Sequence, residues 1–172
     1  LKLGIICLGI QLKPFAFLEF GKIAIPLIII CIVSVLLVIK LISRKIIIPK
    51  RMSYLISVGS TVCGTTAIMA MAPVINAKKN EVSYAIANIT LFGIISMLAY
   101  PYFANFYFEG SPLLVGLFLG TSIRETAQVA AAGLIYDQQF NSPETLNIAT
   151  VTKLIRNTFL VIMIPLFAFL YN

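Results

Sequence analysis

The sequence has no histidine, and only 11% of its 172 residues are charged. Without histidine it lacks the side chain most often used to ligate metals and to move protons near neutral pH. The cysteines Cys7, Cys31 and Cys63 are odd in number and show no C-x-x-C spacing, which supports neither a disulfide framework nor a metal site. Cys-His, Ser-His and paired-carboxylate arrangements for acid–base work are also lacking. We therefore expect a protein that is not an enzyme and carries no cofactor.

Hydrophobic residues make up 60% of the sequence. This balance leaves too little polar surface for a water-soluble domain, so the composition predicts a membrane protein. Residues 1–12 resemble the end of a membrane span, which suggests that the chain is a fragment. Further apolar runs, each near the ~20 residues that cross a ~30 Å hydrocarbon core as helix, fall at 22–42, 52–76, 82–104, 112–136 and 146–171. The predicted fold is all-α, a polytopic bundle of transmembrane helices.

The net charge of +7 comes from lysine and arginine that stand chiefly at the ends of these runs. There they orient a protein in a bilayer and do not indicate a nucleic-acid partner. Residues 40–51 carry five cations and no anion, so this loop is predicted to be cytoplasmic. If 52–76 and 112–136 each dip into the membrane and return, the cations at 78–79 also become cytoplasmic. The charges favour that alternative, but on length we favour interrupted helices that span.

Two apolar segments share a twelve-residue pattern. Residues 59–70 align with residues 120–131 at a constant offset, with Gly, Thr and Ala coinciding at the first, seventh and twelfth positions. Paired, glycine-interrupted segments indicate a transporter binding site, because irregular backbone at membrane depth persists only where protein or a water-filled cavity satisfies it. The first segment nearly matches a phosphate-binding P-loop, but Thr65 stands where that motif needs lysine. Such a turn can still hold an anion at a helix N-terminus, and close helix packing is the alternative.

The segment 112–136 contains an adjacent cation and anion, Arg124 and Glu125. Ionisable groups inside a membrane are costly and mark function by default. As neighbours these two point about 100° apart on a helix and do not simply pair with each other. The last segment carries a polar stripe at three- and four-residue spacing, formed by Thr150, Lys153, Arg156 and Asn157. We expect this stripe to dock against Glu125 and Gln128; a purely structural salt bridge between helices is the alternative.

The charges of this predicted cavity do not balance. Arg124, Lys153 and Arg156 contribute three positive charges and Glu125 one negative charge, so the surplus predicts an anion. Asn88 is a further candidate for lining the same cavity. The predicted substrate-binding residues are Gly59, Ser60, Thr61, Gly64, Thr65, Asn88, Thr121, Ser122, Arg124, Glu125, Gln128, Lys153 and Arg156.

Four runs of the sequence resemble a known family in content and order: GSTVCGTTAIMAMAPVINAK at 59–78, EVSYAIANITLFG at 81–93, GTSIRETAQVAAA at 120–132 and ATVTKLIR at 149–156. They are similar to the YeiH-like sulfate exporter family of bacterial inner-membrane proteins. The resemblance implies a longer protein with inverted repeats and crossed, interrupted helices. Histidine is usual in that family where this chain has Arg124. Because arginine stays charged, proton coupling through this position is not expected.

We therefore predict a multi-pass secondary transporter in the bacterial inner membrane that exports a small anion, such as sulfate or a related sulfur oxyanion, from a site near mid-membrane. Its expected partners are the lipid bilayer and that anion, with homo-oligomerisation left open. One alternative is a Na⁺- or H⁺-coupled antiporter in which Glu125 is the ion-binding carboxylate. The other is a membrane scaffold that does not transport and whose buried charges serve only assembly.

Overall fold

The structure, a computed structural model, describes residues 14–45 and 49–171, so the predicted partial span at 1–12 lies outside the described residues. Within those two ranges every regular element is a helix, which confirms the predicted all-α class. The helices are α2 (Pro14–Lys45), α3 (Lys50–Thr61), α4 (Thr65–Val74), α5 (Lys79–Tyr107), α6 (Pro112–Ser122), α7 (Thr126–Phe140), α8 (Thr145–Thr158) and α9 (Leu160–Tyr171).

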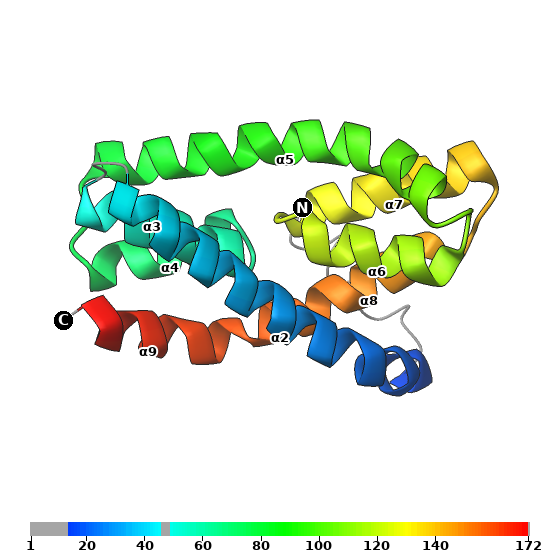
Figure 1. Cartoon of the computed structure of the whole chain (residues 1–172), viewed down its shortest axis with the longest axis horizontal. Helices are drawn as coiled ribbons and strands as arrows, with labels where there is room; N and C mark the ends of the chain where they lie inside the picture. Colours follow the sequence, from blue (N-terminus) through cyan, green and yellow to red (C-terminus); the bar gives the residue numbers. More distant parts are fainter. Residues whose placement is uncertain (1–13, 46–48, 172) are drawn as a thin grey trace.

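Three elements run the length of the molecule: α2, α5, and the pair α8 and α9, which follow one another almost without a break (Figure 1). Among the described residues, the stretches Lys79–Tyr107 and Thr145–Phe169 are long and apolar enough to cross a membrane. The shorter helices fill the two ends of the space between these long elements.

Helices α3 and α4 form a hairpin that enters and leaves at the same end of the molecule (Figure 1). Lys50, at the start of α3, donates to the carbonyl of Tyr171 at the end of α9. Gly59 packs against Ile68 across the hairpin, so closely that a methyl group on Gly59 would lie 2.9 Å from that side chain. The 12 residues of α3 extend only about 18 Å, which is roughly half of a bilayer core.

Helices α6 and α7 form a second hairpin, and this one enters from the opposite end (Figure 1). Tyr136 in the last turns of α7 donates to Asn105 near the end of α5 at 3.0 Å, and the Phe140 ring meets the Tyr102 ring edge-on. Since α6 also begins just after α5 ends, both arms of this hairpin start from the same end.

The helix interruptions expected in 52–76 and 112–136 are therefore present, but in each segment the second half turns back. In shape, each hairpin is what the re-entrant alternative favoured by the charges would require, whereas segment length favoured a continuing span. The chain can reverse after α3 because Gly64 has a positive φ of 67°, a conformation in which any other residue would be strained. Its N–H donates to the carbonyl of Gly59 at 3.1 Å, which closes the tip.

The second hairpin packs closely on α8. A Cβ placed on Gly120 would lie 2.6 Å from the carbonyl oxygen of Ala149, and one placed on Gly116 would lie 2.7 Å from Ile148. The two tips, residues 62–64 and 123–125, also meet each other, since a Cβ on Gly64 would lie 3.6 Å from the Glu125 carboxylate. The interrupted backbone of both segments is thus at the centre of the molecule.

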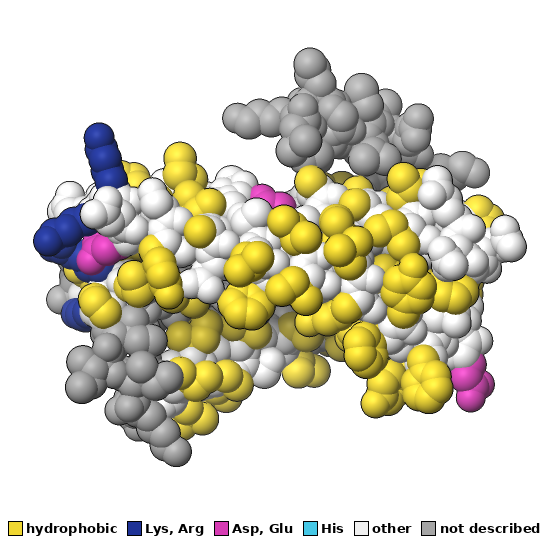
Figure 2. All heavy atoms as spheres, turned by 90° about the horizontal axis from the view of Figure 1, so that it is seen from above, with side chains coloured by type: hydrophobic (Ala, Val, Ile, Leu, Met, Phe, Trp, Pro, Cys, Tyr) yellow, Lys and Arg dark blue, Asp and Glu magenta, His cyan; other side chains and the backbone are white. Residues whose placement is uncertain are grey.

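On the face drawn in Figure 2, many hydrophobic side chains lie between the two ends. Large apolar side chains such as Phe106 and Phe169 are 82% exposed, which suits a surface solvated by lipid. Lysine and arginine side chains gather at the end where α3 begins and α4 returns, where Lys50 and Lys78 are exposed (Figure 2). Glu109 follows α5 at the other end.

This topology predicts which loops share a side of the membrane. In a variant with Cys7, Cys31 and Cys63 replaced by serine, Lys50→Cys and Lys78→Cys should react with a membrane-impermeant maleimide from one side. Glu109→Cys and Glu144→Cys, also exposed, should react from the other side. Labelling of Lys50→Cys and Lys78→Cys from opposite sides would show that 52–76 crosses the membrane.

Candidate functional site

Lys153 of α8 is fully buried and holds the two hairpin tips together. Its ammonium donates to the carbonyl of Val62 at 3.1 Å and to the carbonyl of Ile123 at 2.9 Å. These residues directly follow α3 and α6, where main-chain carbonyls have no partner within their own helix. One side chain therefore satisfies the ends of two helices that enter from opposite sides.

Arg156, one turn further along α8, is 2% exposed and makes the same connection with three bonds. Its Nε donates to the Thr61 carbonyl and its Nη2 to the Ser60 carbonyl, both at 3.0 Å, and its Nη1 donates to the carbonyl of Thr121. The fixed fork of the guanidinium group suits this spread of acceptors. Arg156 thus ties the last turn of α3 to the last turn of α6.

The carbonyls that these two cations bind occupy matching positions in the repeated sequence pattern. Val62 aligns with Ile123, and both accept from Lys153. Ser60 aligns with Thr121, and both accept from Arg156. The two similar segments therefore present carbonyls at matching positions to α8, while their shared first glycines, Gly59 and Gly120, allow close packing.

This arrangement changes the distribution of the charges that the sequence suggested. A helix C-terminus carries roughly half a negative charge, so the ends of α3 and α6 together offset about one of the two positive charges of Lys153 and Arg156. Both cations are engaged by carbonyls and neither forms an ion pair with Glu125. The N-terminal ends of α4 and α7 meet at the same tips and add about one positive charge back, so the sum stays near the predicted surplus of two and only the distribution of the charges differs.

Glu125 lies instead at the N-terminal ends of α4 and α7. It is the residue before α7, and its Oε1 accepts a 2.6 Å hydrogen bond from the Thr65 hydroxyl in the first turn of α4. A carboxylate is stabilised at such a positive helix end. The anion-binding position predicted at the start of α4 is therefore filled by the protein's own carboxylate.

The predicted docking of the α8 stripe on Glu125 and Gln128 is not what the structure shows. Gln128 donates to the Thr90 carbonyl of α5 at 3.4 Å and packs against Gly93. Asn157 is the member of the stripe that reaches α7, where it donates to Thr126 at 3.2 Å. The reason is that Lys153 and Arg156 are attracted to free helix-end carbonyls, which the sequence does not mark.

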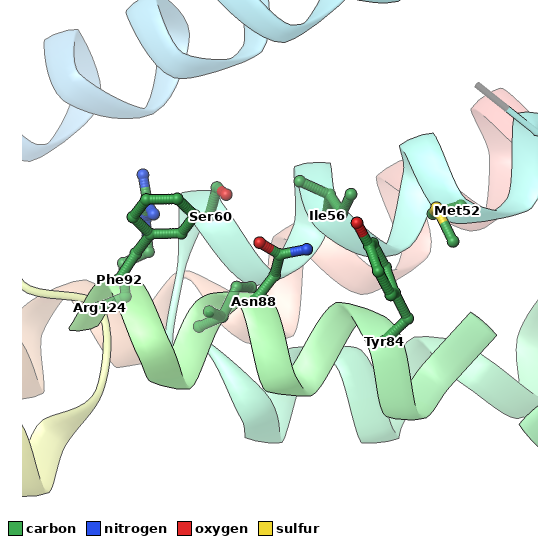
Figure 3. A pocket seen from close by; sticks show the side chains of 8 residues that line it. Met52, Ile56, Ser60, Tyr84, Asn88, Phe92 and Arg124 are labelled. Atoms are coloured by element: carbon green, nitrogen blue, oxygen red, sulfur yellow. The ribbon is translucent and has the colours of Figure 1, made fainter. Parts of the chain in front are cut away.

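Arg124 differs from the other two cations because its guanidinium group has no hydrogen-bond or ion-pair partner within residues 14–45 and 49–171. It lies at the tip of the second hairpin and borders a cavity of about 290 Å³ between α3 and α5. Figure 3 shows Tyr84 and Asn88 rising from α5 towards α3, which carries Ser60. The cavity is lined by Met52, Ile56, Ser60, Tyr84, Asn88, Ile89, Phe92 and Arg124.

Only some of the predicted site residues can face a ligand in this cavity. The Thr61 and Thr121 hydroxyls donate to carbonyls of their own helices, Ser57 and Leu117, and Gly59 and Gly120 serve close packing. Ser60, Asn88 and Arg124 line the cavity together, while Ser122 lies beside Arg124 at the end of α6. Phe92 also lines the cavity but is not among the predicted residues. It lies four residues after Asn88, as Asn88 does after Tyr84, so this spacing could have identified it as a lining residue.

Comparison with known proteins gives one family. A family model described as conserved hypothetical protein 698 matches residues 1–172. The chain is 36% identical over 176 residues to a UPF0324 membrane protein of Fusobacterium nucleatum, covering 100% of this chain and 49% of that protein. It is 31% identical over 158 residues to the UPF0324 inner membrane protein YeiH of Escherichia coli K12, covering 91% of this chain and 44% of YeiH.

The chain spans about half the length of the curated relatives that it matches. No solved structure matches it. The family resemblance seen in the four sequence runs is confirmed by these matches.

The position of Lys153 predicts a large effect on stability. In Lys153→Met the buried carbonyls of Val62 and Ile123 lose their donor, at a cost of about 1–3 kcal/mol each, offset in part because no ammonium is buried any longer. We expect the free energy of unfolding to fall by about 2 kcal/mol or more, measured by thermal unfolding in detergent. Lys78→Met, at an exposed position, is the matched control and should unfold like the parent. An unchanged melting temperature for Lys153→Met would contradict the assigned role.

Proposed function

The chain belongs to the family described as conserved hypothetical protein 698, whose relatives are UPF0324 membrane proteins, and on that basis we propose that it is part of a secondary transporter for a small anion. The anion is sulfate or a related sulfur oxyanion, and the membrane is the bacterial inner membrane. The complete transporter would contain this chain as about half of its length.

The observation that carries this proposal is the unpaired guanidinium group of Arg124. Lys153 and Arg156 have carbonyl acceptors, and the Glu125 carboxylate has Thr65, but within the described ranges Arg124 has no hydrogen-bond acceptor and borders the cavity. A positive charge at the tip of a membrane hairpin is costly unless something compensates it. A bound anion would supply that compensation.

The cavity offers the chemistry that a small oxyanion needs. Arginine presents several N–H donors in a planar fork and binds oxyanions strongly. The hydroxyl of Ser60 has no partner within the described part of the chain and lines the same cavity, as does the amide of Asn88. Together these groups surround one space with donors from α3, α5 and the second hairpin.

The fold supports transport as the use of this site. Two re-entrant hairpins bring helix ends and irregular backbone to the middle of the molecule, and such backbone persists at membrane depth only where protein or a cavity satisfies it. Many transporters bind their substrate at such interruptions near the bilayer midplane. With the basic end in the cytoplasm by the positive-inside rule, the cavity beside α3 would lie on the cytoplasmic side of Arg124.

The proposal predicts that anion binding depends on Arg124. Arg124→Gln keeps hydrogen-bonding capacity but removes the charge, and one charged hydrogen bond contributes about 1.5–3 kcal/mol. We expect sulfate affinity to fall at least tenfold, measured by isothermal titration on the full-length protein in detergent and by sulfate flux in liposomes. Lys78→Gln removes one positive charge at the molecular end and should leave both unchanged. Equal binding by Arg124→Gln and the parent would refute the proposal.

A second candidate, a Na⁺- or H⁺-coupled antiporter, draws on the position of Glu125 at the meeting point of both tips. Under the anion proposal the Glu125 carboxylate joins the two tips by accepting from Thr65. Glu125→Gln should therefore retain sulfate binding that depends on Arg124. Loss of a Na⁺- or pH-driven flux in Glu125→Gln, with no dependence on any anion, would instead favour the antiporter. If no anion in a panel shifts the melting temperature and no flux is seen, the scaffold alternative is preferred.

A further inference from the structure

A second cavity, of about 200 Å³, lies on the other side of Arg124. It is lined by Phe92, Gly93, Ser96, Tyr100, Ser122 and Arg124. Among the described lining residues, Arg124 and Phe92 are the two that border both cavities. The first cavity extends along α5 towards Tyr84, at the basic end, and the second extends along α5 towards Tyr100. The guanidinium group and the Phe92 ring therefore separate two spaces that lead in opposite directions.

Five of the seven α5 residues that line the two cavities are spaced evenly on both sides of Phe92. Steps of four residues lead from Tyr84 through Asn88 to Phe92, and then through Ser96 to Tyr100. Residues four apart are neighbours on a helix surface, so these five form one oblique stripe. Each half of the stripe has a small polar side chain next to Phe92 and a tyrosine beyond it.

Each hairpin also contributes one free hydroxyl to the cavity on its own side. In α3 the hydroxyl of Thr61 bonds to its own helix, while that of Ser60 is free and lines the first cavity. In α6 the hydroxyl of Thr121 bonds to its own helix, while that of Ser122 is free within the described residues and lines the second cavity. Ser60 and Ser122 do not align in the repeated pattern, but each places one hydroxyl in the cavity on the side of its own hairpin.

From this correspondence we infer that the second cavity is a second half-site for the same oxyanion, and that Arg124 serves both half-sites in turn. This inference depends on the proposed function. The donors of the first half-site are Ser60, Asn88 and Tyr84. Those of the second are Ser122 and Tyr100, because the Ser96 hydroxyl already donates to the carbonyl of Phe92 at 2.8 Å and offers only lone pairs. Phe92 separates the two positions, and the anion passes it together with the flexible Arg124 side chain.

Two matched double variants test this inference in liposomes, with inorganic sulfate as the probe. Ser60→Ala with Tyr84→Phe removes two donors from the first half-site, and Ser122→Ala with Tyr100→Phe removes two from the second. All four hydroxyls are free of partners within the described chain, so neither double variant breaks an internal hydrogen bond. The measured quantity is the apparent sulfate affinity for flux started from each side of the membrane.

We expect the first double variant to weaken the apparent affinity from the basic side, and the second from the opposite side, by about tenfold each. The ratio of the affinity measured from the basic side to that measured from the opposite side should therefore fall in the first double variant and rise in the second. Tyr102→Phe, on α5 but outside the stripe, is the control and should shift neither. If both double variants weaken the same side, or the second weakens neither, the second half-site is refuted while binding that depends on Arg124 still stands. If no sulfate binds to the parent protein, both the proposed function and this inference fail.

Accessibility of single cysteines gives an independent readout. Asn88→Cys and Ser96→Cys each lie four residues from Phe92, in opposite directions. In a background without native cysteines, a charged thiol reagent should modify the first from the basic side and the second from the opposite side, and sulfate should slow both reactions several-fold. Sulfate protection of Asn88→Cys alone would overturn the second half-site.

Discussion

The arrangement of this protein depends on two buried cations that bind main-chain carbonyls. Lys153 and Arg156 together satisfy five carbonyls, those of Ser60, Thr61, Val62, Thr121 and Ile123. A hairpin that ends in the middle of a membrane exposes such groups where no water can reach them, and each unsatisfied group is costly there. Lys153 and Arg156 satisfy these carbonyls at both tips, so the two hairpins share α8 as a common partner.

This constraint also determines which cation is left for a ligand. The carbonyls at the C-terminal ends of α3 and α6 bind Lys153 and Arg156. The N-terminal ends of α4 and α7 and the Thr65 hydroxyl stabilise the Glu125 carboxylate. Arg124, at the tip itself, has no such partner among the described residues and borders both cavities. The central charges thus divide into a structural group on α8 and one free guanidinium group beside α5, and the proposed function follows from that division.

Part of this could be predicted from the sequence. Long apolar runs have few stable forms other than helices in a bilayer, and a cation in such a run is costly, so both the helical fold and Arg124 were identified. The direction of α4 and α7 was left open, because an apolar segment of that length fits either one span or two short arms, and loop charge and segment length favoured different alternatives. The roles of Lys153 and Arg156 were also hidden, because their acceptors are main-chain groups that every residue carries. The alignment of residues 59–70 with 120–131 predicted that the two segments are related elements, but not that their carbonyls bind Lys153 and Arg156.

The most direct measurement is the position of a bound anion in crystals of the full-length protein grown with selenate, located by anomalous scattering from selenium. We expect an anomalous peak at hydrogen-bonding distance, about 3 Å, from the Arg124 guanidinium group, in one of the two cavities on either side of Phe92. A peak at Lys153 and Arg156, with the carbonyls of Val62 and Ile123 released, would contradict it. So would a peak at the start of α4 in place of the Glu125 carboxylate.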